Sequence, residues 1–403
     1  MKQCKQIDND VFWIGSDDRR LALFENVFPI PNGISYNSYF VDDEKTVLLD
    51  TVDKAVSEVF FDNLTYLLHG RELDYVIINH MEPDHCATLG ELVLHYPNVK
   101  IIGNVKTFQL INQFFTFETE QRSIVVKEGD TICTGKHTFQ FLMAPMVHWP
   151  EVMVTYDQSN RVLYSADAFG TFGALNGHIF ADMIDFEGQL LPEARRYYSN
   201  IVGKFGIATQ SLLKKVSALD IAMLCPLHGP VWRKDIEWYI DKYEKWSTYQ
   251  PEMNAIMVAF GSIYGHTENA VNILTSELDR LGVSNIAVYD VSSTDPSIIV
   301  SEAYRCSHIV LASATYNGGV FSKMGTVLHD LKFYNVSNRT VALIENGSWA
   351  PMAAKVMKDE LLSMKNITIL DRVVTIRSAV KEEQYEELQA LAKDIAESIK
   401  NSN

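Results

Sequence analysis

The segment that follows the apolar run Val76–Ile78 concentrates side chains that bind metals. It contains His80, Glu82, Asp84 and His85, so two imidazoles and two carboxylates fall within six residues. Imidazole and carboxylate together are the ligands of borderline transition metals, and a tight turn can direct alternate side chains toward one centre. Such groups just after a buried strand are costly unless they are paired or bind a metal. A solvated polar loop is the alternative interpretation.

Three later residues of the same kind each stand at the end of an apolar run that predicts a strand: His148, Asp167 and His228. Loops at one edge of an α/β structure can bring together ligands that are far apart in sequence, because the scaffold determines where the strands end. Seven ligands are more than one tetrahedral ion needs. They suit two metals that share a bridging carboxylate.

The full spacing, His80-x-Glu82-x-Asp84-His85-x62-His148-x18-Asp167-x60-His228, resembles the metal site of the flavodiiron proteins (A-type flavoproteins). The resemblance implies a metallo-β-lactamase-like αββα sandwich as the first domain. It also implies one iron held by His80, Glu82 and His148, a second held by Asp84, His85 and His228, and Asp167 as the bridge. Zinc hydrolases of this fold usually carry a second histidine where this chain has Glu82, and an anionic oxygen ligand favours iron.

Two further positions are candidates for catalysis near this site. His178 lies on the loop after Asp167 and could line the substrate pocket as a proton donor. The segment that contains Tyr197 and Tyr198 resembles the one from which the family places a tyrosine near the irons. The sequence leaves open which of the two faces inward, and we take Tyr197 as the candidate. The histidines without companion ligands are expected to be structural or solvated: His69, His95, His137, His308 and His329.

The second half of the chain carries three loops of small, hydroxylated and aromatic residues, each after a strand-like run. A strand, a small polar loop and a helix start present backbone N–H groups and hydroxyls to a phosphate. Aromatic faces can stack on an isoalloxazine, and amides can hydrogen-bond its polar edge. The loops resemble those of a short-chain flavodoxin that binds FMN. The candidate FMN residues are Ser262, Ile263, Tyr264, Gly265, His266, Thr267, Ala314, Thr315, Tyr316, Asn317, Gly318, Asn346, Gly347, Ser348 and Trp349.

Periodicity separates the chain into two domains, residues 1–250 and 251–403, at the proline that follows the helical stretch Ile236–Trp246. The first domain mixes short β-branched runs with helical patterns such as Ser57–Leu68. In the second, strand-like runs at 255–260, 286–290, 308–313, 340–344 and 367–376 alternate with helical patterns. This alternation predicts a flavodoxin-like, doubly wound parallel sheet.

Composition excludes several classes of protein. The net charge of −16 opposes binding to nucleic acid. Five cysteines with no Cys-x-x-Cys pair argue against a disulfide scaffold, a zinc ribbon or a rubredoxin module in this chain. No apolar stretch is long enough to span a membrane and the first residues lack a signal-peptide pattern, so we expect a cytoplasmic protein.

The resemblance implies a class A flavodiiron oxidoreductase that reduces dioxygen to water, nitric oxide to nitrous oxide, or both. Its cofactors would be two iron ions per chain and FMN. A rubredoxin or similar carrier would donate the electrons, and a head-to-tail homodimer or dimer of dimers would bring the flavin of one subunit beside the irons of another. Two alternatives remain: a zinc-dependent hydrolase fused to a flavodoxin, and an electron carrier whose first domain is only structural.

Overall fold

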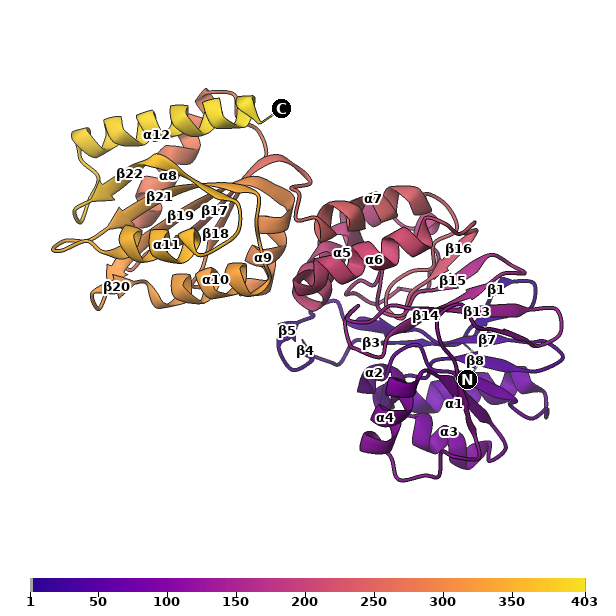
Figure 1. Cartoon of the computed structure of the whole chain (residues 1–403). Helices are drawn as coiled ribbons and strands as arrows, with labels where there is room; N and C mark the ends of the chain where they lie inside the picture. The colour runs from indigo at the N-terminus through magenta and orange to yellow at the C-terminus, as the bar shows by residue number, and fades with distance from the viewer. Residues whose placement is uncertain (1–2, 403) are drawn as a thin grey trace. The chain divides into compact units, whose positions relative to one another are not determined.

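The computed structural model describes residues 3–402, and the chain divides into two compact units, Met1–Glu244 and Lys245–Asn403. The first unit contains two main sheets and the second contains one (Figure 1). No helix among the described residues is long and apolar enough to cross a membrane.

Two facing sheets form the centre of the first unit. One has seven strands in the order β1-β2-β7-β8-β9-β10-β11 and the other has five in the order β12-β13-β14-β15-β16. Their bounds are β1 Lys5–Asp8, β2 Val11–Trp13, β7 Tyr39–Val41, β8 Val47–Leu49, β9 Tyr75–Ile77, β10 Lys100–Gly103, β11 Ser123–Val125, β12 Thr131–Cys133, β13 Thr138–Met143, β14 Met153–Asp157, β15 Val162–Tyr164 and β16 Met223–Cys225. A single buried cluster takes residues from both sheets, among them Trp13, Leu49, Phe141 and Tyr164. The core therefore lies between the sheets.

Helices cover the outer faces of the two sheets, which completes the αββα sandwich. Figure 1 shows α1, α3 and α4 on one side and α5, α6 and α7 on the other. The helix bounds are α1 Ser57–Leu68, α2 Pro83–Cys86, α3 Leu89–His95, α4 Val105–Phe114, α5 Leu191–Tyr197, α6 Gly206–Val216 and α7 Ile236–Ser247. Two small antiparallel sheets belong to the same unit: β3 (Ser16–Asp18) pairs with β6 (Ile34–Tyr36), and the hairpin of β4 (Leu23–Phe24) and β5 (Phe28–Pro29) lies between them in sequence.

The second unit is a parallel five-stranded sheet in the order β18-β17-β19-β21-β22, with β20 added antiparallel to β19. Numbered along the unit, this is the 2-1-3-4-5 order of flavodoxin-like folds. The strands are β17 Met253–Gly261, β18 Ile286–Asp290, β19 Cys306–Tyr316, β20 Gly319–Val320, β21 Arg339–Asn346 and β22 Ile367–Ile376; the helices are α8 His266–Arg280, α9 Pro296–Arg305, α10 Ser322–Phe333, α11 Ala353–Leu362 and α12 Glu382–Asn401. The predicted fold class is confirmed.

Candidate metal centre

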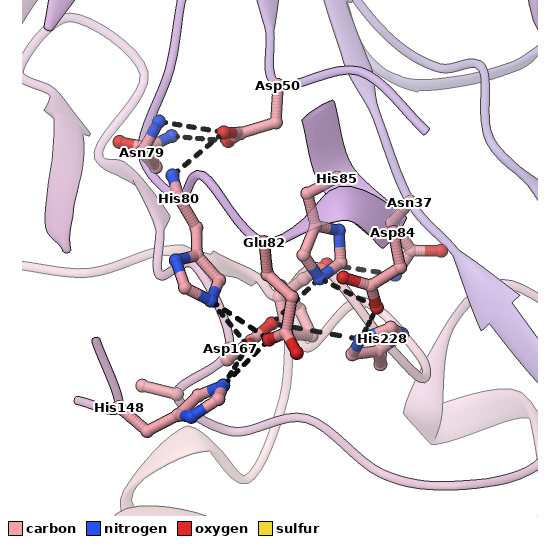
Figure 2. Close-up of polar contacts among 12 residues, drawn as sticks. Asn37, Asp50, Asn79, His80, Glu82, Asp84, His85, His148, Asp167 and His228 are labelled. Carbon is pink, nitrogen blue, oxygen red and sulfur yellow. Dashed lines mark hydrogen bonds and ion pairs between the residues drawn. The ribbon is translucent and has the colours of Figure 1, made fainter. Parts of the chain in front are cut away.

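The seven predicted metal ligands come from loops at the ends of strands in the first unit and converge on one place (Figure 2). The first four follow β9: Glu82 stands in extended backbone at the start of α2, and Asp84 and His85 lie in that short helix. The others follow β13, β15 and β16 in turn. The strand residues around these ligands are buried. Polar side chains at the strand ends are therefore costly unless they interact with one another or with a metal.

One group of ligand atoms gathers around a single oxygen of Asp167. The Nε2 of His148 lies 2.9 Å from Glu82 Oε2 and 3.2 Å from Asp167 Oδ2. The Nε2 of His80 lies 3.2 Å from Glu82 Oε2 and 3.3 Å from Asp167 Oδ2. These four buried side chains offer two nitrogens and two oxygens to one centre.

The second group faces the other oxygen of Asp167. The Nε2 of His85 lies 3.0 Å from Asp167 Oδ1 and 3.4 Å from Asp84 Oδ2, and the Nε2 of His228 lies 3.1 Å from Asp84 Oδ2. Asp167 thus presents one oxygen to each group. This is the geometry of a carboxylate that bridges two cations.

The polar atoms of the second group support a cation between them. Asp84 Oδ1 and Oδ2, His85 Nε2, Asp167 Oδ1 and His228 Nε2 are buried, and none makes a well-formed hydrogen bond within residues 3–402. Buried charged atoms without such partners are costly. A metal ion satisfies all of them at once, so the residues fit the implied dinuclear site.

Electrostatics within the centre also favour anionic carboxylates. Burial opposes the charged form of Asp167, but the imidazoles of His85 and His80 hold the pKa of its carboxyl well below the usual range. Burial likewise opposes the imidazolium of His148, yet its hydrogen bonds to Asp167 and Glu82 raise its pKa to about 9. At neutral pH the carboxylates are therefore anionic and attract a neighbouring positive charge, whether a protonated imidazole or a metal ion supplies it.

Further groups orient the ligands from behind. Asp50 is fully buried and accepts hydrogen bonds from the backbone N–H groups of Asn79 and His80 at 2.7 and 3.1 Å. Burial raises the pKa of Asp50 to about 6. The His228 Nδ1 lies 2.7 Å from the backbone oxygen of Ser35. Asn37 donates to the backbone oxygen of Pro226 at 2.9 Å, and so anchors the loop that carries His228.

Tyr197, not Tyr198, faces the metal ligands. Burial and then the charges of Asp167, Asp84 and Glu82 raise the pKa of the Tyr197 phenol. Its ring lies 5.5 Å from that of His228. Tyr198 packs instead against Tyr243, with ring centroids 4.9 Å apart.

Local backbone geometry separates the two tyrosines. α5 ends at Tyr197 and continues directly into a wider π-helical turn, Tyr198–Val202. Such turns are frequent at functional sites. Gly170 lies against the Tyr197 ring: a Cβ at this position would come within 2.9 Å of Tyr197 Cε1.

The structure does not bring His178 to the metal ligands. Its side chain is exposed, and it makes no polar contact with any of the seven ligands in the part of the chain that the structure describes. The preceding Asn176 and Gly177 are exposed as well, and both turn the chain with positive φ angles, 50° and 90°. A role for His178 as a proton donor therefore has no support from its position.

Sequence reasoning missed Glu25, at the tip of the β4–β5 hairpin. The residue as a whole is exposed, yet burial of its carboxyl and a hydrogen bond to Glu82 raise its pKa to about 8. Its φ of 49° is uncommon for a residue with a side chain. Beside it, Phe24 packs edge-on against His228 at 5.4 Å. No local sequence pattern signals this contact, because the hairpin meets the ligands only after folding.

In the second unit, a cavity of about 520 Å³ opens at the carboxyl ends of the parallel strands. This volume is in the range of small-molecule and cofactor sites. Of the predicted FMN residues, all except Gly265 and Tyr316 line it. Gly265 instead provides the left-handed turn (φ 88°) at which α8 begins, and the Tyr316 ring packs against Phe321 with centroids 6.3 Å apart.

A fourth loop, absent from the predicted set, contributes Ser378 to this cavity, and Ala350 and Met352 line it too. The Asn346 amide donates to the backbone oxygen of Ser378 at 2.9 Å and its oxygen accepts from the Ser378 backbone N–H at 3.1 Å. The hydroxyls of Ser378 and Ser348 lie 2.8 Å apart. Small residues, hydroxyls, an amide and the indole of Trp349 suit a flavin mononucleotide in chemistry and in size.

An αββα sandwich that carries two groups of potential metal ligands, followed by a flavodoxin-like sheet, defines the class of protein. Comparison with known proteins agrees: residues 34–229 match the family model "ODP family beta lactamase". The chain is 26% identical over 402 residues to a nitric oxide reductase of Moorella thermoacetica, covering 99% of this chain and 100% of that protein.

Two solved structures extend the likeness to both domains. One is the rubredoxin oxygen:oxidoreductase of Desulfovibrio gigas, with a TM-score of 0.92, 25% identity and 99% of each chain covered. The other is a variant of the flavo di-iron protein of Thermotoga maritima, with a TM-score of 0.87, 26% identity and 98% of each chain covered. The resemblance to the flavodiiron proteins that the ligand spacing indicates is thereby confirmed.

Proposed function

We propose that this chain is a flavodiiron oxidoreductase that reduces dioxygen to water, nitric oxide to nitrous oxide, or both. The observation that carries the proposal is the convergence of the seven ligands in two groups around Asp167. A flavin-sized cavity in the second unit supports it. The names of the Moorella and Desulfovibrio relatives, a nitric oxide reductase and a rubredoxin oxygen:oxidoreductase, point to the same chemistry.

In this proposal His80, Glu82 and His148 hold one iron, Asp84, His85 and His228 hold the other, and Asp167 bridges them. When bound, the two irons and FMN supply the sites for gas activation and electron storage. The chain's own residues shape the pocket. The Tyr197 ring lies 5.5 Å from that of His228, so its phenol is available to donate a hydrogen bond near the ligands. Phe24 packs edge-on against His228 and would limit access of water to it.

Electron supply and assembly complete the proposal. A rubredoxin or similar carrier would reduce FMN, as in a class A enzyme, and a head-to-tail homodimer would place the flavin of one subunit near the irons of another. We assign residues 1–250 to the metal domain and 251–403 to the FMN domain, and we expect the protein to act in the cytoplasm.

The test combines metal analysis with turnover. Protein produced with iron and zinc both available should contain about two irons and one FMN per chain. The reduced enzyme, mixed anaerobically with each gas in turn, should consume it at a rate that identifies the preferred substrate. Two zincs and no iron per chain, with hydrolysis of ester or lactam substrates, would instead favour a zinc hydrolase fused to a flavodoxin.

A further inference from the structure

Glu151 is a buried carboxylate directly behind one metal ligand. Its side chain is fully buried, and its Oε1 lies 2.8 Å from the Nδ1 of His80. The same oxygen accepts a hydrogen bond from the backbone N–H of Met81 at 2.9 Å. Because Glu151 occupies Nδ1, it fixes the imidazole so that Nε2 faces Glu82 and Asp167.

The other ligand histidines have no such support. His228 Nδ1 contacts a neutral backbone oxygen of Ser35, the ring hydrogen bonds of His148 run from Nε2 to other ligands, and His85 Nδ1 lacks a hydrogen bond. Within residues 3–402, Glu151 is the only carboxylate that contacts the Nδ1 of a ligand histidine.

This asymmetry has an electrostatic consequence. The first-group ligands (His80, Glu82, His148) and the second-group ligands (Asp84, His85, His228) each contain one carboxylate, and the two groups share Asp167. Glu151 places a negative charge directly on a first-group imidazole. The other buried carboxylate behind the centre, Asp50, accepts from the backbone N–H groups of Asn79 and His80 and touches no ligand ring nitrogen. A carboxylate behind a ligand imidazole orients it and makes it a stronger donor, and loss of such a partner typically lowers metal affinity about 10–100-fold.

We propose that Glu151 is a positioning residue that makes the first group the tighter of the two metal sites, so that it is filled first and emptied last. The inference rests on the proposed function only in assuming that the centre holds two metals. It does not depend on which gas is reduced or on the flavin.

The experiment titrates the metal-free full chain with Co²⁺ and follows binding by visible absorption. His228→Ala disables the second group and His148→Ala disables the first, so each background reports on one site. Glu151→Gln should weaken Co²⁺ binding by roughly 10–100-fold in the His228→Ala background and leave it unchanged in the His148→Ala background. In the chain with all seven ligands, the substitution should remove the preference for filling the first group.

Two controls separate positioning from general damage. Glu128→Gln changes an exposed glutamate that pairs with Lys215 at 2.7 Å, and it should leave both affinities unchanged. In zinc-loaded protein, long-range ¹H–¹⁵N spectra should show the Nδ1-protonated form of His80, and Glu151→Leu should alter that signal alone.

Equal affinity of the first group with and without Glu151, or an equal loss in both groups, would overturn the proposal. Absence of gas reduction would count against the oxidoreductase function and leave the Co²⁺ result standing.

Discussion

In the first domain the candidate centre is made of buried imidazoles and carboxylates, whereas the cavity of the second domain is lined by small, hydroxylated and amide residues with Trp349 at its rim. A metal site needs charge, and the surrounding protein must orient each ligand. A flavin site needs shape, exposed backbone and a few hydrogen bonds. A single substitution among the metal ligands should therefore abolish binding, whereas a single substitution in the flavin cavity should only weaken it.

The largest effect is expected from Asp167→Ala, which removes the residue shared by both groups of ligands. The variant should lose both metals and all gas reduction, while its FMN content and the reducibility of its flavin stay normal. Metal analysis, flavin absorption and turnover measure these quantities in one preparation. Retained gas reduction would show that Asp167 is not part of the site and that the two regions do not differ in their sensitivity to substitution.

Gly170→Ala tests how closely the pocket is packed. The new methyl would meet Tyr197 Cε1 at 2.9 Å and the Asp167 backbone oxygen at 3.0 Å. Overpacking of this kind costs about 1–3 kcal/mol of unfolding free energy, measurable by denaturant titration. Gly325→Ala is the matched control, because it lies inside α10 with its nearest neighbour 3.6 Å away and should stabilise by about 0.5–1 kcal/mol. A variant at position 170 as stable as the wild type would show a looser pocket.

Trp349→Ala probes the flavin cavity, where the indole is exposed and available to stack. Loss of an aromatic contact worth about 0.5–1.5 kcal/mol should raise the Kd for FMN roughly 2–13-fold. Fluorescence titration of the flavin-free protein measures it, and metal content should not change. An unchanged Kd would place the isoalloxazine elsewhere in the cavity.

His137 offers an imidazole–carboxylate pair outside the metal centre, with Nδ1 2.6 Å from Asp157 Oδ2. Burial alone would lower the pKa of His137, but the hydrogen bond and charge of Asp157 raise it above the usual value near 6.5. The pair therefore stabilises the fold fully below about pH 6.5 and loses this contribution as the pH rises through the raised pKa.

The measurement compares the unfolding free energy of the wild type and His137→Phe across pH. The stability difference should shrink as the pH rises through the raised pKa, because the deprotonated imidazole loses its charge interaction with Asp157. A difference that is independent of pH would show that the pair contributes through packing alone.

Much of this protein follows from its sequence by local rules. Both domains are predicted by the ligand types, by their spacing and by the alternation of strand-like and helical runs. The ends of the predicted strands indicate where the candidate metal and flavin sites lie. The helix Ser57–Leu68 and the strand runs at 286–290 and 367–376 coincide with α1, β18 and β22. Periodicity is local, so one chain suffices to predict it.

Tertiary structure decided the rest, because contacts between distant segments select among side chains that are equivalent in sequence. It turned Tyr197 inward and Tyr198 toward Tyr243 through the π-helical turn and the close approach of Gly170. It left His178 at the surface and added Ser378 to the flavin cavity. The sequence by itself determined which groups could bind two metals and a flavin. Only folding brought Glu151 behind His80, since the two lie on separate loops that meet when the sheets pack together.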